Sequence, residues 1–437
     1  MVMVDGAGSV QDAAGESCAY GQQCLDEQDY FSAFYAFSEA LEHNPLLVQA
    51  YVGRMRARMK MGDMAGAIED GNRALRLDSQ HAPLYLYRGE AYIAQAFPRE
   101  AIKDFTRAIR LEPRLLPAYL CRARAYQLSG DLQSALIDVT KAICLYPRAI
   151  ELYFFRGNIH LALGACRRAC ADFSHVLRED AQHAAARFQR GIASLALKDY
   201  SGAVTDLSYA IYLEPINAEA YRHRGRAYLA QESFKVAVAD FDKAIEIAEA
   251  NPELFLLRAS AYNALGDYPR AIADCARALT LQPEHAGAYA ARAAAYTGME
   301  LYREAVEDCT RALELNPEES EMLLTRAIAQ NVLGQFTAAA EDCTRALELE
   351  PTLARAHVIR AIARSELCDY RGAVADCTQA LELRPDDPAA YYNRGLTRSA
   401  MGERQRSRDD LHRAAALYQS QGNTAKSQLA QHAANRV

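Results

Sequence analysis

The stretch Asp308–Pro317 reads DCTRALELNP, and it returns as DCTRALELEP at Asp342–Pro351 and as DCTQALELRP at Asp376–Pro385. The step between the copies is 34 residues each time. A fixed period of about 20 to 50 residues is typical of proteins that stack one small structural unit many times. The repeat therefore has to be placed along the chain before any shorter motif is interpreted.

The phase of Pro317 extends in both directions and divides the chain into twelve units without an insertion. Residues 1–13 before them are predicted to be a flexible leader, and residues 422–437 after them a C-terminal capping helix, of which only Leu429 and a few Ala could face inward. A stack of this kind grows in one dimension, so the 437-residue chain needs no single central core. The predicted units are 14–47, 48–81, 82–115, 116–149, 150–183, 184–217, 218–251, 252–285, 286–319, 320–353, 354–387 and 388–421.

Each unit carries the pattern of two short helices joined by a turn. In the eighth unit Phe255, Ala259 and Tyr262 recur at i, i+4 and i+7, the spacing of one helix face. Two adjacent positions of the 34-residue unit, which we call offsets, then hold Gly and Asp. Gly ends a helix in a left-handed turn, and Asp caps the next helix. These residues are Gly62, Gly130, Gly164, Gly266, Gly334 and Gly402, and Asp29, Asp63, Asp131, Asp199, Asp267 and Asp369. Eight of the twelve units close on a Pro, which stops the second helix.

Small residues recur where the two helices of a unit must cross. Ala33 and its copies hold one second-helix offset in eleven units, with Ser407 in the last, and the first-helix offset of Gly21 holds mostly Gly or Ala. A bulky side chain at such a crossing would force the helices apart. The sequence therefore predicts an all-α fold of closely packed helical hairpins.

The period, the Gly/Ala–Ala–Ala spacing and the terminal Pro resemble those of tetratricopeptide repeats over residues 14–421. The chain departs from that family in having no Trp, and in having Arg at a first-helix offset where the family favours a large apolar residue. The resemblance implies an α-solenoid, a right-handed superhelix of stacked antiparallel helix pairs. It also implies a concave wall, lined by the first helices, that holds a peptide or a partner protein without catalysis.

Composition and charge narrow the possible partners. The net charge is −7 with both signs scattered, so no basic stripe for nucleic acid is present. No apolar run approaches the roughly 18 residues of a membrane span. The first residues lack a secretory signal, so we expect a cytoplasmic protein, with export as the alternative if a leader has been removed. Cys275, Cys309, Cys343 and Cys377 share one offset and are expected to be buried free thiols, as in a reducing compartment.

Two rows of charge follow the repeat and are expected to be at least partly buried. Pairing within a unit gives eleven pairs, whereas pairing from each Asp to the Arg of the next unit gives ten, so the count favours pairing within a unit. Contact with both neighbours, and a row of solvated surface charges, are the alternatives. The rows are Arg54, Arg88, Arg122, Arg156, Arg190, Arg224, Arg258, Arg292, Arg326, Arg360 and Arg394, and Asp70, Asp104, Asp138, Asp172, Asp206, Asp240, Asp274, Asp308, Asp342, Asp376 and Asp410.

One first-helix offset on the expected concave wall is apolar in every unit but one. We interpret its richest part as a groove for an extended or helical segment with apolar anchors, with a carboxylate near two arginines, because binding surfaces concentrate aromatic residues and Arg. The alternative is that this stripe packs between neighbouring first helices and is hidden. The predicted groove residues are Leu86, Tyr87, Leu120, Arg124, Phe154, Phe155, Asn158, Phe188, Arg222 and Arg226.

The sequence contains no phosphate-binding Gly loop, no GxSxG and no HExxH motif, so we expect no catalysis and no cofactor. His160, Cys166, Cys170 and His175 lie close together, but their spacing matches no common zinc pattern, so no metal is predicted. The function expected is that of a protein–protein interaction scaffold. A structural protein that assembles with itself into homo-oligomers is the second hypothesis.

Overall fold

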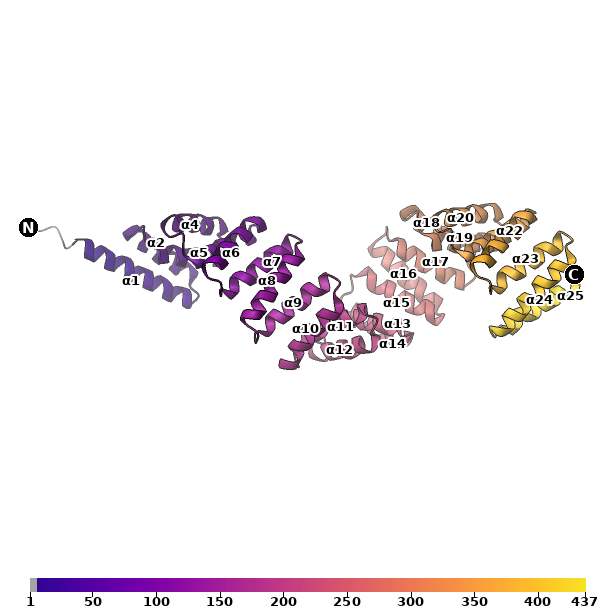
Figure 1. The fold of residues 1–437 in the computed structure, drawn as a ribbon, viewed down its shortest axis with the longest axis horizontal. Helices are drawn as coiled ribbons and strands as arrows, with labels where there is room; N and C mark the ends of the chain where they lie inside the picture. The colour runs from indigo at the N-terminus through magenta and orange to yellow at the C-terminus, as the bar shows by residue number, and fades with distance from the viewer. Residues whose placement is uncertain (1–5) are drawn as a thin grey trace, which may run out of the picture. The chain divides into compact units, whose positions relative to one another are not determined.

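The computed structural model describes the backbone of residues 6–437 and the side chains from residue 13 onward. Over that range the chain forms 25 α-helices and no strand. It divides into two compact units, the first ending at Leu213 and the second beginning at Glu214. Each unit is a stack of helix pairs (Figure 1), and each is described by itself.

The first unit contains six helical hairpins, in which each odd-numbered helix pairs with the even-numbered helix that follows it. Its helices are α1 (Gly6–Asp26), α2 (Tyr30–His43), α3 (Val48–Lys60), α4 (Met64–Leu77), α5 (Ala82–Ala94), α6 (Pro98–Leu111), α7 (Leu116–Leu128), α8 (Leu132–Leu145), α9 (Ile150–Ala162), α10 (Cys166–Glu179), α11 (Ala184–Ala196) and α12 (Tyr200–Leu213).

The second unit contains six further hairpins and one final helix that packs against α24. Its helices are α13 (Ala218–Ala230), α14 (Phe234–Ile247), α15 (Pro252–Leu265), α16 (Tyr268–Leu281), α17 (Ala286–Gly298), α18 (Tyr302–Leu315), α19 (Ser320–Val332), α20 (Phe336–Leu349), α21 (Ala354–Glu366), α22 (Tyr370–Leu383), α23 (Pro388–Ala400), α24 (Arg404–Ser420) and α25 (Thr424–Arg436).

From the second hairpin onward, each first helix begins at the residue where the sequence places the start of a unit, from Val48 to Pro388. The N-terminus differs from the prediction of a loose leader over residues 1–13, because α1 already begins at Gly6. Residues 6–13 therefore extend the first helix of the first hairpin, while residues 1–5 lie outside the described range.

The turn inside every hairpin has one residue in the left-handed region. Six of these residues are the predicted glycines, with φ between 70° and 86°. The other hairpins place a residue with a side chain there at φ between 58° and 64°, namely Gln28, Ala96, Lys198, Glu232, Glu300 and Cys368. The predicted Asp caps are present, because each accepts a hydrogen bond from the backbone N–H three residues later. The turn is therefore set by backbone geometry, and glycine lowers its strain.

The hairpin cores depend on matched volumes at two facing offsets. A Cβ built on Gly157 would lie 2.6 Å from Cε1 of Phe173, and one on Gly191 would lie 2.7 Å from Cγ of Leu207. Where the first helix has Ala instead, as at Ala259, the facing residue is the smaller Cys275. The four predicted buried thiols are therefore packing residues, and burial raises their pKa to about 12.

The two charged rows pair within each hairpin, as the count of pairs favours. In all eleven described pairs Nε and Nη2 of Arg donate to the two oxygens of Asp, with Nη2–Oδ1 distances of 2.6–2.8 Å. The Asp residues are only 1–7% exposed. The third guanidinium nitrogen, Nη1, often donates to a side chain of the preceding hairpin. For example, Nη1 of Arg122 donates to Oγ1 of Thr106 at 3.0 Å. The pairs thus fix both the hairpin and its stacking.

The final helix packs differently from the expectation that Leu429 would face inward. Leu429 is 61% exposed, whereas Ser427, Ala430 and Ala434 are buried. Oγ of Ser427 donates to the carbonyl of Ala415 at 2.8 Å, which holds α25 close to α24. Such close approach requires small residues at the contact, and Leu429 lies beside that stripe.

Candidate functional site

In the first unit, first helices of neighbouring hairpins also touch one another, as α1 touches α3 and α3 touches α5. The second helices make no comparable contact with each other in the described part of the chain. The first helices are therefore the more closely spaced layer. The faces that they turn away from the second helices form one wall. We call this surface the first-helix wall.

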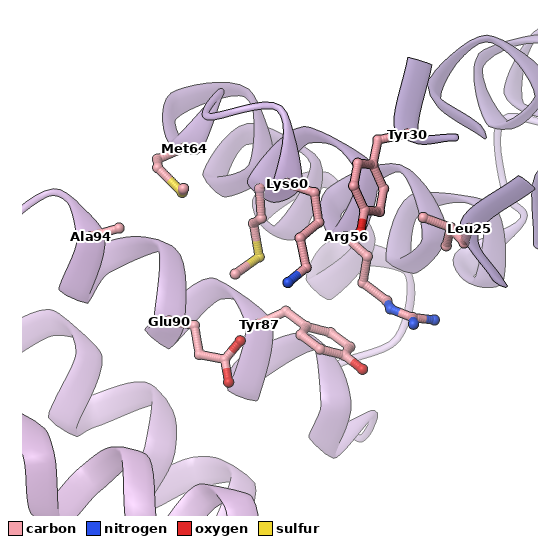
Figure 2. A pocket seen from close by; sticks show the side chains of 9 residues that line it. Leu25, Tyr30, Arg56, Lys60, Met64, Tyr87, Glu90 and Ala94 are labelled. Carbon is pink, nitrogen blue, oxygen red and sulfur yellow. The ribbon is translucent and has the colours of Figure 1, made fainter. Parts of the chain in front are cut away.

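A cavity of about 430 Å³ opens on this wall across the first three hairpins. Figure 2 shows Arg56 and Lys60 of α3 and Tyr87 and Glu90 of α5 extending into the same space. Tyr30 of α2 also lines the cavity. Its apolar lining is Leu25, Met59, Met64 and Ala94.

The two cations in this cavity have no ion-pair partner among the described residues, unlike the eleven arginines of the paired row. Lys60 is exposed and Arg56 is half-buried. Glu90 is the one carboxylate of the lining, and burial raises its pKa, although the thiol of Cys121 and the charges of Lys60 and Arg124 oppose that shift. The cavity therefore presents an excess of positive charge beside aromatic and thioether groups.

A second cavity of about 510 Å³ lies on the same wall, towards α1, and Arg56 lines both. Its lining includes Phe37 and Gly53. A Cβ on Gly53 would lie 2.2 Å from Cζ of Phe37, so a side chain here would collide with the buried ring below. Since Gly53 has no side chain, the wall stays open at this point. Nδ1 of His81, also in the lining, is buried without a hydrogen-bond partner.

Of the ten predicted groove residues, Tyr87 lines the first cavity. Leu86 is only 7% exposed and packs with Phe105, so it belongs to the core. Leu120 and Phe155 are half-buried against the cluster around Val139 and Ile143. At Leu86 and Leu120 the side chains of the apolar stripe therefore pack against neighbouring helices.

Two further aromatic residues of the predicted groove are also half-buried, Phe154 and Phe188. The ring of Phe154 lies 5.8 Å from that of Phe173 and 5.0 Å from that of His183. Asn158 lies beside them, and its side-chain oxygen is buried without a hydrogen-bond partner. These side chains are therefore only partly exposed on the wall.

The predicted arginines differ in their freedom to bind. Arg124, in the first unit, is exposed, whereas Arg222 and Arg226 belong to the second unit. Nη1 of Arg222 contacts Oε1 of Glu253 at 2.9 Å, and the same guanidinium pairs with Glu219. Arg222 is thus already neutralised within its own unit, while Arg226 is exposed.

Comparison with known proteins agrees with the architecture. One model of the tetratricopeptide repeat matches residues 286–319, and a second matches residues 156–215, 199–254 and 224–287. The matched part of the chain, residues 156–319, consists of tetratricopeptide repeats. A homologue of protein SGT1 from Oryza sativa subsp. japonica is 34% identical over 81 residues, which are 18% of this chain and 22% of that protein.

Two solved structures resemble the tetratricopeptide-repeat array over nearly its whole length. Yeast Tom70 is 17% identical with a TM-score of 0.41, and 97% of this chain and 96% of that chain are covered. The Cut9–Hcn1 hetero-tetramer of the APC/C is 13% identical with a TM-score of 0.49, and 95% of each chain is covered. No helix in the described residues is long and apolar enough to cross a membrane.

Sequence reasoning missed Arg56 and Lys60 as groove residues of this tetratricopeptide-repeat array. Arg56 follows Gly53 by three residues and Lys60 follows Arg56 by four, so all three lie on one face of the same helix. The sequence signal that could have identified them is a pair of basic residues on the same helix face as Gly53, in a unit where that position of the wall has no bulky side chain. The Cys166 and Cys170 region holds no group of three metal-ligating side chains within the described part of the chain.

Proposed function

We propose that this tetratricopeptide-repeat protein is a non-catalytic scaffold that holds a segment of a partner protein on the first-helix wall of its first unit. The observation that carries this proposal is the pair of cavities that share Arg56, together with two cations that lack ion-pair partners. A cation without a partner inside a cavity favours a ligand that brings the negative charge. Protein segments supply such groups with their Asp and Glu side chains.

The chemistry of the lining narrows the segment further. Arg56 and Lys60 would bind an acidic side chain, while Tyr30, Tyr87 and Met59 would enclose an apolar one next to it. Aromatic and thioether groups can pack against apolar side chains of many shapes. Such a lining would accept different large apolar residues rather than one particular residue. The preferred segment therefore has an acidic residue adjacent to a large apolar residue.

The remaining wall residues extend this proposal. Beyond the cavities, Arg124 would add a further cation, and Phe154, Phe155, Phe188 and Asn158 would contact the partner along their exposed edges. Leu86 and Leu120 would support the wall from below. In the second unit, taken by itself, we propose exposed Arg226 as a contact for a partner, and Arg222 only when its ion pair with Glu253 is broken in favour of that partner.

A selection experiment tests this function directly. A random peptide library displayed on phage is selected on the wild-type protein and counter-selected on the Arg56→Ala/Lys60→Ala variant. We expect enrichment of peptides that place Asp or Glu beside a large apolar residue. Peptides that bind both proteins equally, or the absence of any enriched class, would contradict the assignment of this wall as the binding surface.

The cysteines support a proposal for the compartment. All eleven are free thiols, and Cys275, Cys309, Cys343 and Cys377 are buried in the hairpin cores. A protein that keeps so many thiols reduced is best suited to a reducing compartment, so we propose that it acts in the cytoplasm.

A further inference from the structure

The outer surface of the first hairpin differs from that of every later hairpin. It lacks the buried Arg–Asp pair, because Tyr20 and Ala36 occupy those offsets. Tyr20 is 56% exposed, Phe31 60% and Tyr35 57%. Three large exposed aromatic residues on one hairpin form an apolar surface that is characteristic of binding sites.

These aromatic residues share a shallow groove with carboxylates. The groove has a volume of about 490 Å³, and Tyr20, Phe31 and Tyr35 line it together with Glu39 and Glu42. The rings of Phe31 and Tyr35 lie edge to face, 4.8 Å apart. Neither glutamate has an ion-pair partner in the described part of the chain, and Oε2 of Glu39 accepts a hydrogen bond from Ser17 at 3.1 Å. Ring faces beside unpaired carboxylates attract cations. We call this surface the N-terminal aromatic patch.

The opposite end of the chain carries the complementary chemistry. The helix α25 contains Lys426, His432 and Arg436 and no Asp or Glu. All three basic side chains are exposed. Leu429 on the same helix is 61% exposed, although end caps of repeat arrays normally present a polar outer face. One exposed apolar side chain among cations is what an aromatic and acidic groove would accept.

We propose that α25 of one copy docks on the N-terminal aromatic patch of a second copy. Leu429 would contact the aromatic rings, and Lys426 and Arg436 would lie near Glu39 and Glu42. Since the two surfaces lie on different parts of the chain, this contact is heterologous and leaves a free end on each copy. Such a contact continues into open chains unless the geometry closes a ring. The proposal concerns a surface separate from the first-helix wall and does not depend on the partner proposed for it.

Charge exchange between the two surfaces provides the test. One variant carries Glu39→Lys and Glu42→Lys, and the other carries Lys426→Glu and Arg436→Glu. Each variant has the same sign of charge at both ends, so it should associate with itself at least about tenfold more weakly than the wild type. An equimolar mixture of the two should associate again, because each variant then meets an end of opposite charge. Average mass is measured by sedimentation and light scattering over a wide range of protein concentration.

Every outcome bears on the proposal. Growth of the wild type with concentration, loss of growth in each variant and recovery in the mixture would support it. A wild type that stays monomeric would overturn it and would leave the patch to a basic segment of another protein. Growth that persists in both variants, or a mixture that stays monomeric, would overturn it as well. Circular dichroism spectra that match the wild type establish that the exposed substitutions leave the helices folded.

Discussion

The facing residues Gly157 and Phe173 allow the packing of a hairpin to be tested by one added methyl group. The Cβ of Gly157→Ala would lie 2.6 Å from Cε1 and 2.9 Å from Cζ of Phe173. Overpacking of this kind costs about 1–3 kcal/mol. Alanine is favoured over glycine within a helix by about 1 kcal/mol, so we expect a net loss of about 0–2 kcal/mol.

The effect of Gly157→Ala on stability should change sign when the ring of Phe173 is removed. Phe173→Cys alone should cost about 2–4 kcal/mol, because it leaves a cavity in the core. With Phe173→Cys present, Gly157→Ala should stabilise the hairpin by about 1 kcal/mol, since the methyl group enters that cavity and favours the helix. The double variant reproduces the natural combination of Ala259 with Cys275.

Hydrogen exchange of the amides in α9 and α10, followed by mass spectrometry, is the suitable assay. A stack of repeats need not unfold as one cooperative unit, so a local opening free energy is more informative than a single melting temperature. If Gly157→Ala has the same effect with and without Phe173→Cys, the two positions do not constrain each other and the volume argument is wrong.

Three further predictions concern the charged rows, the turns and the thiols. Asp138→Ala removes the buried partner of the half-buried Arg122 and should lower local stability by about 3–5 kcal/mol, as measured by hydrogen exchange. Ala96→Gly should stabilise its turn by about 0.5–1 kcal/mol because Ala96 has a φ of 62°, whereas Gly130→Ala, at a φ of 78° with open space around it, should destabilise by about 1 kcal/mol. Burial raises the pKa of Cys275 to about 12, so at pH 8 iodoacetamide should modify exposed Cys144 readily and Cys275 only after unfolding, as peptide mass spectrometry would reveal.

Each of these has a matched control. Glu69→Ala breaks the exposed i,i+4 pair with Arg73 and should cost less than about 0.5 kcal/mol. A loss as small for Asp138→Ala would mean that the paired rows are solvated charges. Equal effects of the two turn substitutions would contradict the role of φ, and equally rapid alkylation of both thiols would contradict the burial of Cys275.

The repeat made the fold predictable from sequence to the residue. Each copy repeats the same helix spacing, cap and crossing residue, so errors in one unit are corrected by the others, and the within-hairpin ion pairs followed from counting. The first helix was less predictable because no preceding unit fixes where α1 begins, and the pattern alone did not show that α1 starts at Gly6. The inward prediction for Leu429 was wrong because α25 packs on α24 through Ser427, Ala430 and Ala434, and α25 does not follow the repeat pattern that defines the inner faces of the other helices.

The candidate site was harder to predict than the fold. The apolar stripe is shared between packing and binding, and its side chains alone do not distinguish the two. Leu86 is buried by its neighbours, while Tyr87, one position later, reaches the cavity. The unpaired state of Arg56 depends on what lies around it in space, which the linear pattern does not give. Pairing of Arg222 with Glu253, 31 residues later, is equally a property of the folded stack.

The most direct test of the proposed wall is the affinity of one selected acidic peptide for four forms of the protein, measured by calorimetry. Relative to wild type, we predict that Arg56→Ala/Lys60→Ala weakens binding at least about tenfold, because hydrogen bonds to charged groups contribute about 1.5–3 kcal/mol each. Glu90→Gln should strengthen binding, because it removes the one negative charge of the cavity lining. Arg73→Ala/Lys103→Ala makes the same change in net charge on second helices and should leave the affinity unchanged. Equal weakening by the two double substitutions would contradict a specific site on the first-helix wall.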